Sequence, residues 1–235
     1  MLLDGEHLVQ AALAAGITLD AVLTDGRAHT TADRARDAGV PVHDVSTAVI
    51  DAAAPVRTPG GVLALARWQA STIADALPHP NGLVLALVDV QDPGNVGNVI
   101  RSADALGVAA VLTLGATADP ANWKALRGAM GSTFRLPVGR GETHAAIDLL
   151  HERGWDTIVT TPEGGVPLHA HAFDRPTAVL LGNEGGGLPA DVTARARGRL
   201  TIPMRDEVES LNVATTAALV AYEVHRRRTA PGQVP

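Results

Sequence analysis

The sequence predicts an α/β protein with a parallel sheet in its C-terminal part and a smaller α/β layer before it. Helix-like and strand-like segments alternate along the 235 residues, which is typical of this fold class. The apolar segment Leu83–Asp89 has the composition of a strand that is buried on both faces of a parallel sheet. Hydrophobic residues make up 46% of the chain, which is enough for a core.

The first block, residues 1–68, is predicted to contain alternating helices and strands. A helix over Thr31–Ala38 is expected to end at Gly39 in a left-handed cap, and Ser46 is expected to begin another helix. The other expected elements are a helix over Glu6–Ala15 and strands over Ala21–Thr24, Val40–Val45 and Gly61–Arg67. Residues 69–81 have little periodicity and contain two prolines, so they are predicted to be a linker.

The second block, residues 82–235, continues the alternation after the strand at Leu83–Asp89. Helices are expected over Val96–Leu106, Trp123–Met130, Ala145–Arg153 and Leu211–Arg228, and strands over Ala109–Leu114, Asp156–Thr160, Thr177–Leu181 and Leu200–Ile202. Parallel sheets of this kind bind ligands beyond the carboxyl ends of their strands.

The composition excludes several classes of protein. The chain has no cysteine, which excludes disulfides, thiolate zinc sites and a cysteine nucleophile. No apolar run approaches the roughly 20 residues that span a bilayer, and no signal peptide is recognisable, so a cytoplasmic protein is expected. The net charge of −6 argues against a nucleic-acid binder unless basic clusters are local. The candidate clusters contain Lys124, Arg127, Arg135 and Arg140, and His225–Arg228.

Three glycine- or asparagine-rich segments each follow a predicted strand. Asp89–Arg101 leads from a strand through a Pro-Gly turn into a helix start, where open N–H groups attract anions. Its G-x-x-G spacing is not the dinucleotide G-x-G-x-x-G. Leu180–Pro189 has four glycines around one carboxylate, and Ile202–Ala218 joins a strand to a small-residue helix for which Ser210 suits the N-cap. Taken alone, the first segment is also compatible with an ordinary capped turn, the second with a flexible loop, although its glycines disfavour that, and the third is best explained as an ordinary capped helix.

Together, the strings D-P-G-N-V-G-N-V-I-R, L-G-N-E-G-G-G-L and I-P-M-…-V-E-S-L-N-V-A resemble the signature motifs of the SpoU/TrmH family of RNA ribose 2′-O-methyltransferases, in the SPOUT class. Ala125–Pro137 resembles the family's intermediate region, so the resemblance covers nearly all of the second block. More weakly, Gly5–Val9 and Thr58–Ala64 resemble the family's N-terminal substrate-binding domain, which is related to an RNA-binding ribosomal protein.

The resemblance implies a deep trefoil knot, a homodimer, an RNA substrate, S-adenosyl-L-methionine as cofactor and no metal. The implied cofactor-binding residues are Thr160, Leu181, Gly182, Asn183, Gly187, Ile202, Met204, Leu211 and Asn212. The implied catalytic residues are Arg101, Asn95, Glu184, Ser210 and Asn212, and the RNA-binding residues are Asn95, Arg101, Arg127 and Arg135. Arg101 either accepts the ribose hydroxyl proton with help from a substrate phosphate or stabilises the developing alkoxide as a cation.

Four readings stay open at this point. Large-subunit rRNA is the expected substrate, but a tRNA ribose and a role in antibiotic resistance of the ribosome are alternatives. A second reading is a non-catalytic RNA-binding protein with the same fold, and a third is an enzyme that methylates a tRNA base. The fourth, a nucleotide-dependent oxidoreductase, is disfavoured because the G-x-G-x-x-G fingerprint is absent.

Overall fold

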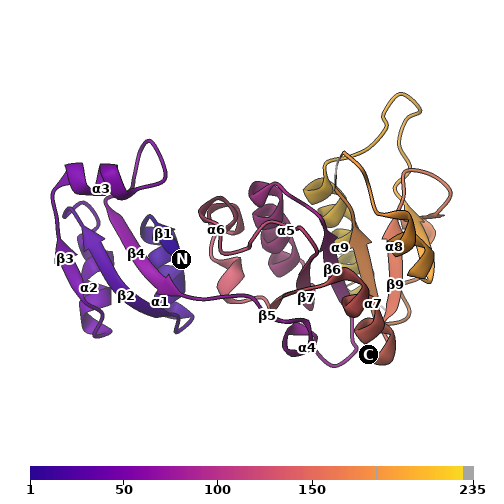
Figure 1. Cartoon of the computed structure of the whole chain (residues 1–235), viewed down its shortest axis with the longest axis horizontal. Coiled ribbons are helices and arrows are strands. Elements are labelled where there is room, and N and C mark those ends of the chain that lie inside the picture. Colours follow the sequence, from indigo (N-terminus) through magenta and orange to yellow (C-terminus); the bar gives the residue numbers. More distant parts are fainter. Residues whose placement is uncertain (184, 230–235) are drawn as a thin grey trace.

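The computed structural model describes residues 1–183 and 185–229, and these residues form two sheets with separate sets of helices (Figure 1). The N-terminal unit contains β1 (Leu2–Asp4), α1 (Glu6–Ala14), β2 (Thr18–Thr24), α2 (His29–Asp37), β3 (Val42–Asp44), α3 (Thr47–Ala53) and β4 (Val62–Arg67). Its strands lie in the order β1-β4-β2-β3, with β4 antiparallel to both of its neighbours.

The C-terminal unit is built on an eight-stranded sheet. Its strands are β5 (Ser71–Thr72), β6 (Leu83–Val88), β7 (Ala110–Leu114), β8 (Val138–Gly141), β9 (Asp156–Thr160), β10 (Val166–Pro167), β11 (Thr177–Leu181) and β12 (Gly198–Thr201). Its helices are α4 (Ile73–Ala76), α5 (Pro93–Ala105), α6 (Trp123–Ala129), α7 (Thr143–Glu152), α8 (Ala190–Arg195) and α9 (Val213–Thr229), with short 3-10 turns η1 (Ser132–Phe134) and η2 (Leu168–Ala170).

All neighbouring strands of this sheet run parallel, in the order β10-β12-β9-β11-β6-β7-β8-β5. The parallel α/β sheet expected from the sequence is therefore confirmed. The strand order reverses direction at β6, because β7 and β8 extend the sheet to one side while β9, β11 and β12 extend it to the other. Ligands of open α/β sheets bind at such a switch point, outside the carboxyl ends of the strands.

Helices cover both faces of the sheet, which explains why every residue of β6, β7 and β11 is buried. In β6, Leu83, Leu85 and Leu87 pack with residues of α5 and α9, and the alternate residues pack with residues of α4, α7 and α8. Side chains of a strand alternate between the faces of the sheet, so both sets are buried only when both faces are covered. The core of the C-terminal unit thus holds the ends of β6 and β11 in fixed places.

The segment expected to be a linker, residues 69–81, is partly structured. Ser71 and Thr72 pair with β8 at the edge of the large sheet, and Thr72 Oγ1 caps α4 by accepting from the backbone N–H of Asp75 (3.2 Å). Ile73 and Ala76 are buried in the core of the C-terminal unit. A four-residue helix is too short to show a hydrophobic period, so no pattern in the sequence predicts it.

Strand β8 was not predicted because two of its four residues are glycines, which are rare inside strands. A Cβ atom at Gly139 would lie 2.9 Å from the side chains of Ala76 and Leu112, so a larger residue does not fit there. The short elements β1, β10 and α8 were also missed. The left-handed conformation expected at Gly39 is present, with φ of 76°.

The prediction that Ser210 caps the last helix is wrong. Helix α9 begins at Val213, and the side-chain oxygen of Asn212 accepts hydrogen bonds from the N–H groups of Ala214 (2.9 Å) and Thr215 (3.2 Å). Asparagine is as good an N-cap residue as serine, so the sequence alone does not choose between the two positions. Because the helix starts later, Ser210 and Leu211 belong to the loop that follows β12.

Helices α5 and α6 approach each other closely where both carry glycine. A Cβ atom at Gly97 would overlap the backbone of Ala125, and one at Gly128 would lie 3.3 Å from Gly94 O and from Gly97 Cα. The first turns of α5, which contain the first motif, are therefore packed backbone to backbone on α6. None of the helices in the described part of the chain is long and apolar enough to cross a membrane.

We expect Gly97→Ala to destabilise the protein by about 1–3 kcal/mol, because the added methyl group forces the two helices apart. Chemical denaturation would measure the free energy of unfolding. Gly128→Ala is the graded control: its contact is looser, and alanine's higher helix propensity offsets part of the strain, so a smaller loss is expected. A stabilising effect of Gly97→Ala would contradict the close packing.

Candidate active site

A cavity lies beyond the carboxyl ends of β9, β11 and β12, at the edge of the sheet that is uppermost in Figure 1. The segments that follow these three strands line it, together with the first turn of α9. The lining residues are Thr160, Thr161, Pro162, Leu181, Gly182, Asn183, Gly187, Leu188, Leu200, Ile202, Met204, Ser210, Leu211, Val213 and Thr216. The second and third sequence motifs therefore meet in one place.

Eight of the nine residues expected to bind the cofactor line this cavity. They are Thr160, Leu181, Gly182, Asn183, Gly187, Ile202, Met204 and Leu211. The ninth, Asn212, is the cap of α9 and lies beside the cavity residues Leu211 and Val213 in the chain. Sequence reasoning missed six lining residues, which are Thr161, Pro162, Leu188, Leu200, Val213 and Thr216. The first two directly follow β9, so their position at the end of a strand was the available signal.

The loop after β11 folds back on itself so that Asn183 and Gly187 form an isolated antiparallel bridge. The N–H of Gly187 donates to the carbonyl oxygen of Asn183 (2.8 Å), and the N–H of Gly185 donates to the Asn183 side chain (3.2 Å). Gly187 has φ of +64°, a conformation that favours glycine. A Cβ atom at Gly182 would overlap the backbone of Gly187, so this turn requires glycine at position 182.

The first and third motifs are joined by a hydrogen bond between two asparagines. The Asn212 side-chain amide donates to Asn95 Oδ1 (3.1 Å), which links the start of α9 to the first turn of α5. Asp92 caps α5 by accepting from the N–H of Asn95 (3.0 Å), and Pro93 occupies the first turn. All three motifs therefore lie at one edge of the sheet, as the resemblance implied.

Of the other residues expected to be catalytic, Ser210 lines the cavity and Arg101 lies further along α5. The Arg101 side chain is exposed, and within residues 1–183 and 185–229 it has no hydrogen-bond or ion-pair partner. Glu184 lies outside the described residues. An exposed guanidinium on the helix that carries the first motif is available to a substrate phosphate or hydroxyl.

The two other arginines expected to bind RNA are already engaged by carboxylates. Arg127 lies 3.5 Å from Asp4, and Arg135 forms a 2.6 Å ion pair with Asp104. Their predicted contact with RNA stays a prediction, and any such contact must compete with these acids.

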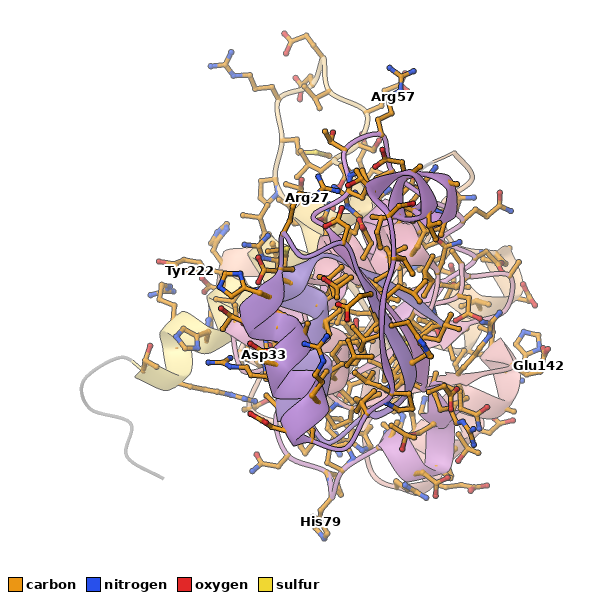
Figure 2. All side chains as sticks on the ribbon, turned by 90° about the vertical axis from the view of Figure 1, so that its left-hand side faces the viewer. Arg27, Asp33, Arg57, His79, Glu142 and Tyr222 are labelled. Carbon is orange, nitrogen blue, oxygen red and sulfur yellow. The ribbon has the colours of Figure 1, made fainter. Side chains whose placement is uncertain are left out.

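The N-terminal unit likewise has few uncompensated arginines. Arg27, Arg36 and Arg67 pair with Asp25, Asp44 and Asp20 respectively. Arg57 extends outward from the loop before β4, as Figure 2 shows. The arginines of this unit therefore do not form a free basic face.

The described lining of the cavity has the character of a site for an organic ligand. Its described lining residues are all uncharged, and many of them are apolar, among them Leu181, Ile202 and Met204. In residues 1–183 and 185–229, no group of three or more His, Asp or Glu side chains is placed to hold a metal ion. Small-molecule sites are mostly apolar with a few placed polar groups, and this cavity has that character.

Comparison with known proteins identifies the family. Residues 82–222 match the model of the SpoU rRNA Methylase family. The chain belongs to this family. It is 33% identical to the 23S rRNA (guanosine(2553)-2′-O)-methyltransferase RlmP of Bacillus subtilis, over 95% of this chain and 87% of that protein.

Solved structures agree with this assignment. An AdoMet-bound rRNA methyltransferase from Sinorhizobium meliloti superposes with a TM-score of 0.87 at 29% identity, covering 97% of this chain and 87% of that one. The SpoU methyltransferase AviRb from Streptomyces viridochromogenes, in complex with AdoMet, gives 0.89 at 26% identity, covering 98% of this chain and 91% of that one. The similarity thus extends over both units, and the SPOUT fold class is confirmed.

We expect Gly182→Ala to weaken binding of S-adenosylmethionine by about tenfold or more, because displacing the loop by about 1 Å removes its fit to the ligand. Isothermal titration calorimetry would measure the dissociation constant. Gly186→Ala is the matched control in the same loop, since a Cβ atom there meets nothing within 4 Å. We expect its affinity to stay within about twofold of the wild type. Equal effects of the two substitutions would contradict a shape requirement at position 182.

Proposed function

We propose that this protein transfers a methyl group from S-adenosylmethionine to a ribose 2′-hydroxyl of ribosomal RNA. The observation that carries the proposal is the convergence of the segments after β9, β11 and β12 on one cavity whose described lining is uncharged, next to the Asn95–Asn212 link. Membership of the SpoU rRNA methylase family supports the same chemistry. The alternatives of an oxidoreductase or a purely structural RNA binder lack a comparable observation.

The cofactor fits the cavity by the chemistry of its lining. Backbone groups of Leu181–Asn183 and of the segment around Ile202–Met204 offer donors and acceptors for an adenine ring and a ribose, between apolar side chains. The tight turn at Gly182 leaves no room for a side chain, so the ligand meets bare backbone there. S-adenosylmethionine supplies an electrophilic methyl group on a sulfonium, and the protein's contribution is binding and orientation.

Arg101 is the residue that we assign to the ribose hydroxyl. As a permanent cation it stabilises the negative charge that develops on the 2′-oxygen and attracts the neighbouring phosphate. A guanidinium resists deprotonation, so electrostatic stabilisation is favoured over a role as the proton acceptor. Asn95 and Asn212 hold the starts of α5 and α9 together, which supports the position of the helix that carries Arg101. Ser210 and Glu184 complete the proposed set.

Large-subunit rRNA is the proposed substrate. RlmP, which is 33% identical to this chain over 95% of the chain's length, is named as a methyltransferase of a guanosine in 23S rRNA. A tRNA remains the alternative substrate. The proposal includes cytoplasmic action and the deep trefoil knot implied by the motifs.

A homodimer is also proposed, and the exposed side of α9 supports it. Leu219 and Tyr222 are large apolar residues with 39% and 55% of their surface exposed, one turn apart on this helix. Figure 2 shows Tyr222 at the left-hand margin of the molecule. An exposed apolar pair on a helix that also borders the cofactor cavity is suited to contact with a second copy.

The direct test is to incubate the protein with S-adenosylmethionine labelled in its methyl group and with separate pools of unmethylated rRNA and tRNA. We expect label in 23S rRNA, at a nucleotide whose 3′ phosphodiester resists alkaline hydrolysis because the 2′-oxygen is methylated. Label in a base would overturn the ribose assignment, and label only in tRNA would overturn the choice of substrate.

We expect Arg101→Ala to lower the rate of methyl transfer by about 100-fold or more, as when a positioned charge-stabilising donor is removed from an active site. The affinity for S-adenosylmethionine should stay within about twofold, because Arg101 does not line the cavity. Single-turnover kinetics and calorimetry measure the two quantities. Arg175→Ala, another exposed arginine, is the control and should keep full activity. Wild-type turnover in Arg101→Ala would remove Arg101 from the mechanism.

A further inference from the structure

The two units are joined by a specific contact on α6 and the turn after it. Figure 1 shows α6 between the N-terminal unit and α5. Leu126 of α6 is fully buried, and it packs in the same apolar cluster as Leu3, Leu8 and Val9 of the N-terminal unit. The N-terminal unit therefore uses a side chain of the C-terminal unit to complete its own core.

The next residue along α6, Arg127, faces a buried carboxylate. Its guanidinium lies 3.5 Å from Asp4 at the end of β1, where the Asp4 side chain is only 8% exposed and that of Arg127 is 49% exposed. Asp4 Oδ1 is buried and has no hydrogen-bond partner in the described part of the chain. Burial raises the pKa of Asp4, and the nearby charge of Arg127 opposes that rise. Without Arg127, the buried charge of Asp4 would therefore destabilise the interface.

Two further contacts fix the same interface. His7 Nε2 donates to the carbonyl oxygen of Met130 (3.0 Å), the residue at which α6 ends in a left-handed conformation with φ of 50°. A Cβ atom at Gly131 would lie 2.7 Å from the Ala11 side chain, so α1 rests directly on the backbone of the turn. The docked arrangement therefore depends on backbone geometry as well as on the ion pair.

The other side of α6 is the surface that packs on the first turns of α5. Gly128, next to Arg127, contacts the backbone of Gly94 and Gly97 in the first motif. One short helix thus touches the N-terminal unit on one side and the helix of Arg101 on the other. The position of the N-terminal unit relative to Arg101 is set through α6.

We propose that Arg127 is a positioning residue that neutralises Asp4 and so latches the N-terminal unit onto α6, at a fixed place relative to Arg101. This replaces a direct RNA contact as its main role. The latch itself is a property of the fold, whereas its consequence for RNA rests on the proposed function. With the latch closed, an RNA held by the N-terminal unit presents its ribose to Arg101 without a further ordering step, which lowers KM rather than raising kcat.

The proposal predicts that loss of Arg127 and loss of the Asp4 charge have unequal effects on the docking of the N-terminal unit. Arg127→Gln leaves the Asp4 carboxylate buried and uncompensated, so the interface opens to let water reach it. Asp4→Asn leaves Arg127 half exposed and hydrated, which costs little. The double variant Asp4→Asn with Arg127→Gln buries no charge, so docking should return. If Arg127 instead contacts an RNA phosphate, the double variant should not recover, because Asp4→Asn cannot replace the lost arginine.

The chain has no cysteine, so labels can be placed without background. Spin labels at Arg34→Cys on α2 and Glu142→Cys before α7, both exposed, report the separation of the two units by electron–electron resonance in the full chain. The labelled chain is mixed with an excess of unlabelled chain, so that distances across the proposed homodimer do not contribute. We then expect one narrow distance distribution in the wild type, Asp4→Asn and the double variant, and a broad one in Arg127→Gln. A narrow distribution in Arg127→Gln, or a broad one in the double variant, would overturn the latch.

Steady-state methylation supplies the second readout. We expect Arg127→Gln to raise KM for rRNA by about three- to tenfold with kcat within about twofold, and the double variant to return to the wild-type KM. A KM that stays raised in the double variant would make Arg127 an RNA contact and overturn its positioning role. If the wild type methylates no RNA, the proposed function fails, while the distance measurement still decides whether the latch exists.

Discussion

The architecture depends on the insertion of β11 between β6 and β9. All five residues of β11 are buried, and it pairs in parallel with both neighbours. A strand in this place ends beside the ends of β6 and β9, so the loop from Gly182 onward emerges between the first motif and the end of β9. Because helices pack on both faces of the sheet, these strand ends have little freedom to move. The cavity is a consequence of strand order more than of any single side chain.

Two glycines allow the close backbone approaches that shape the site. Gly182 lets the loop close on its own backbone, and Gly97 lets α5 rest on α6. The packing of α5 on α6 is also connected to the N-terminal unit, because Leu126 and Arg127 of α6 contact residues of that unit. The Asn95–Asn212 hydrogen bond joins the proposed cofactor cavity to the helix of Arg101, and the close packing of α5 on α6 joins that helix to the proposed RNA-binding unit. Such connections suit a reaction that relies on alignment.

The sequence predicted the α/β class, the parallel sheet and the strands β9 and β11 with their observed bounds. These elements are long enough, or apolar enough, to carry a clear pattern. It failed for α4 and β8, whose formation depends on partners far away in the chain. The cap at Asn212 was misplaced because Ser210 and Asn212 are equally suited to that position, and the structure shows that Asn212 accepts from the first turn of the helix.

For the site, the motifs placed eight of the nine expected cofactor residues around one cavity. They lie together because the motif residues follow strand ends, which the sheet itself brings together. The charges were harder to predict. Arg127 and Arg135 are basic residues near the first motif in the chain, but their acidic partners, Asp4 and Asp104, are far from them in sequence. A sequence pattern shows a charge but not its partner.

The most direct test of the central claim is a crystal structure of the full chain with S-adenosylhomocysteine, the demethylated form of the cofactor. The account predicts the ligand in the cavity between the Gly182–Leu188 loop and the Ile202–Leu211 segment, with its sulfur directed toward the side where Asn95 and Arg101 lie. A ligand bound at any other place, or with its sulfur turned away from α5, would contradict it.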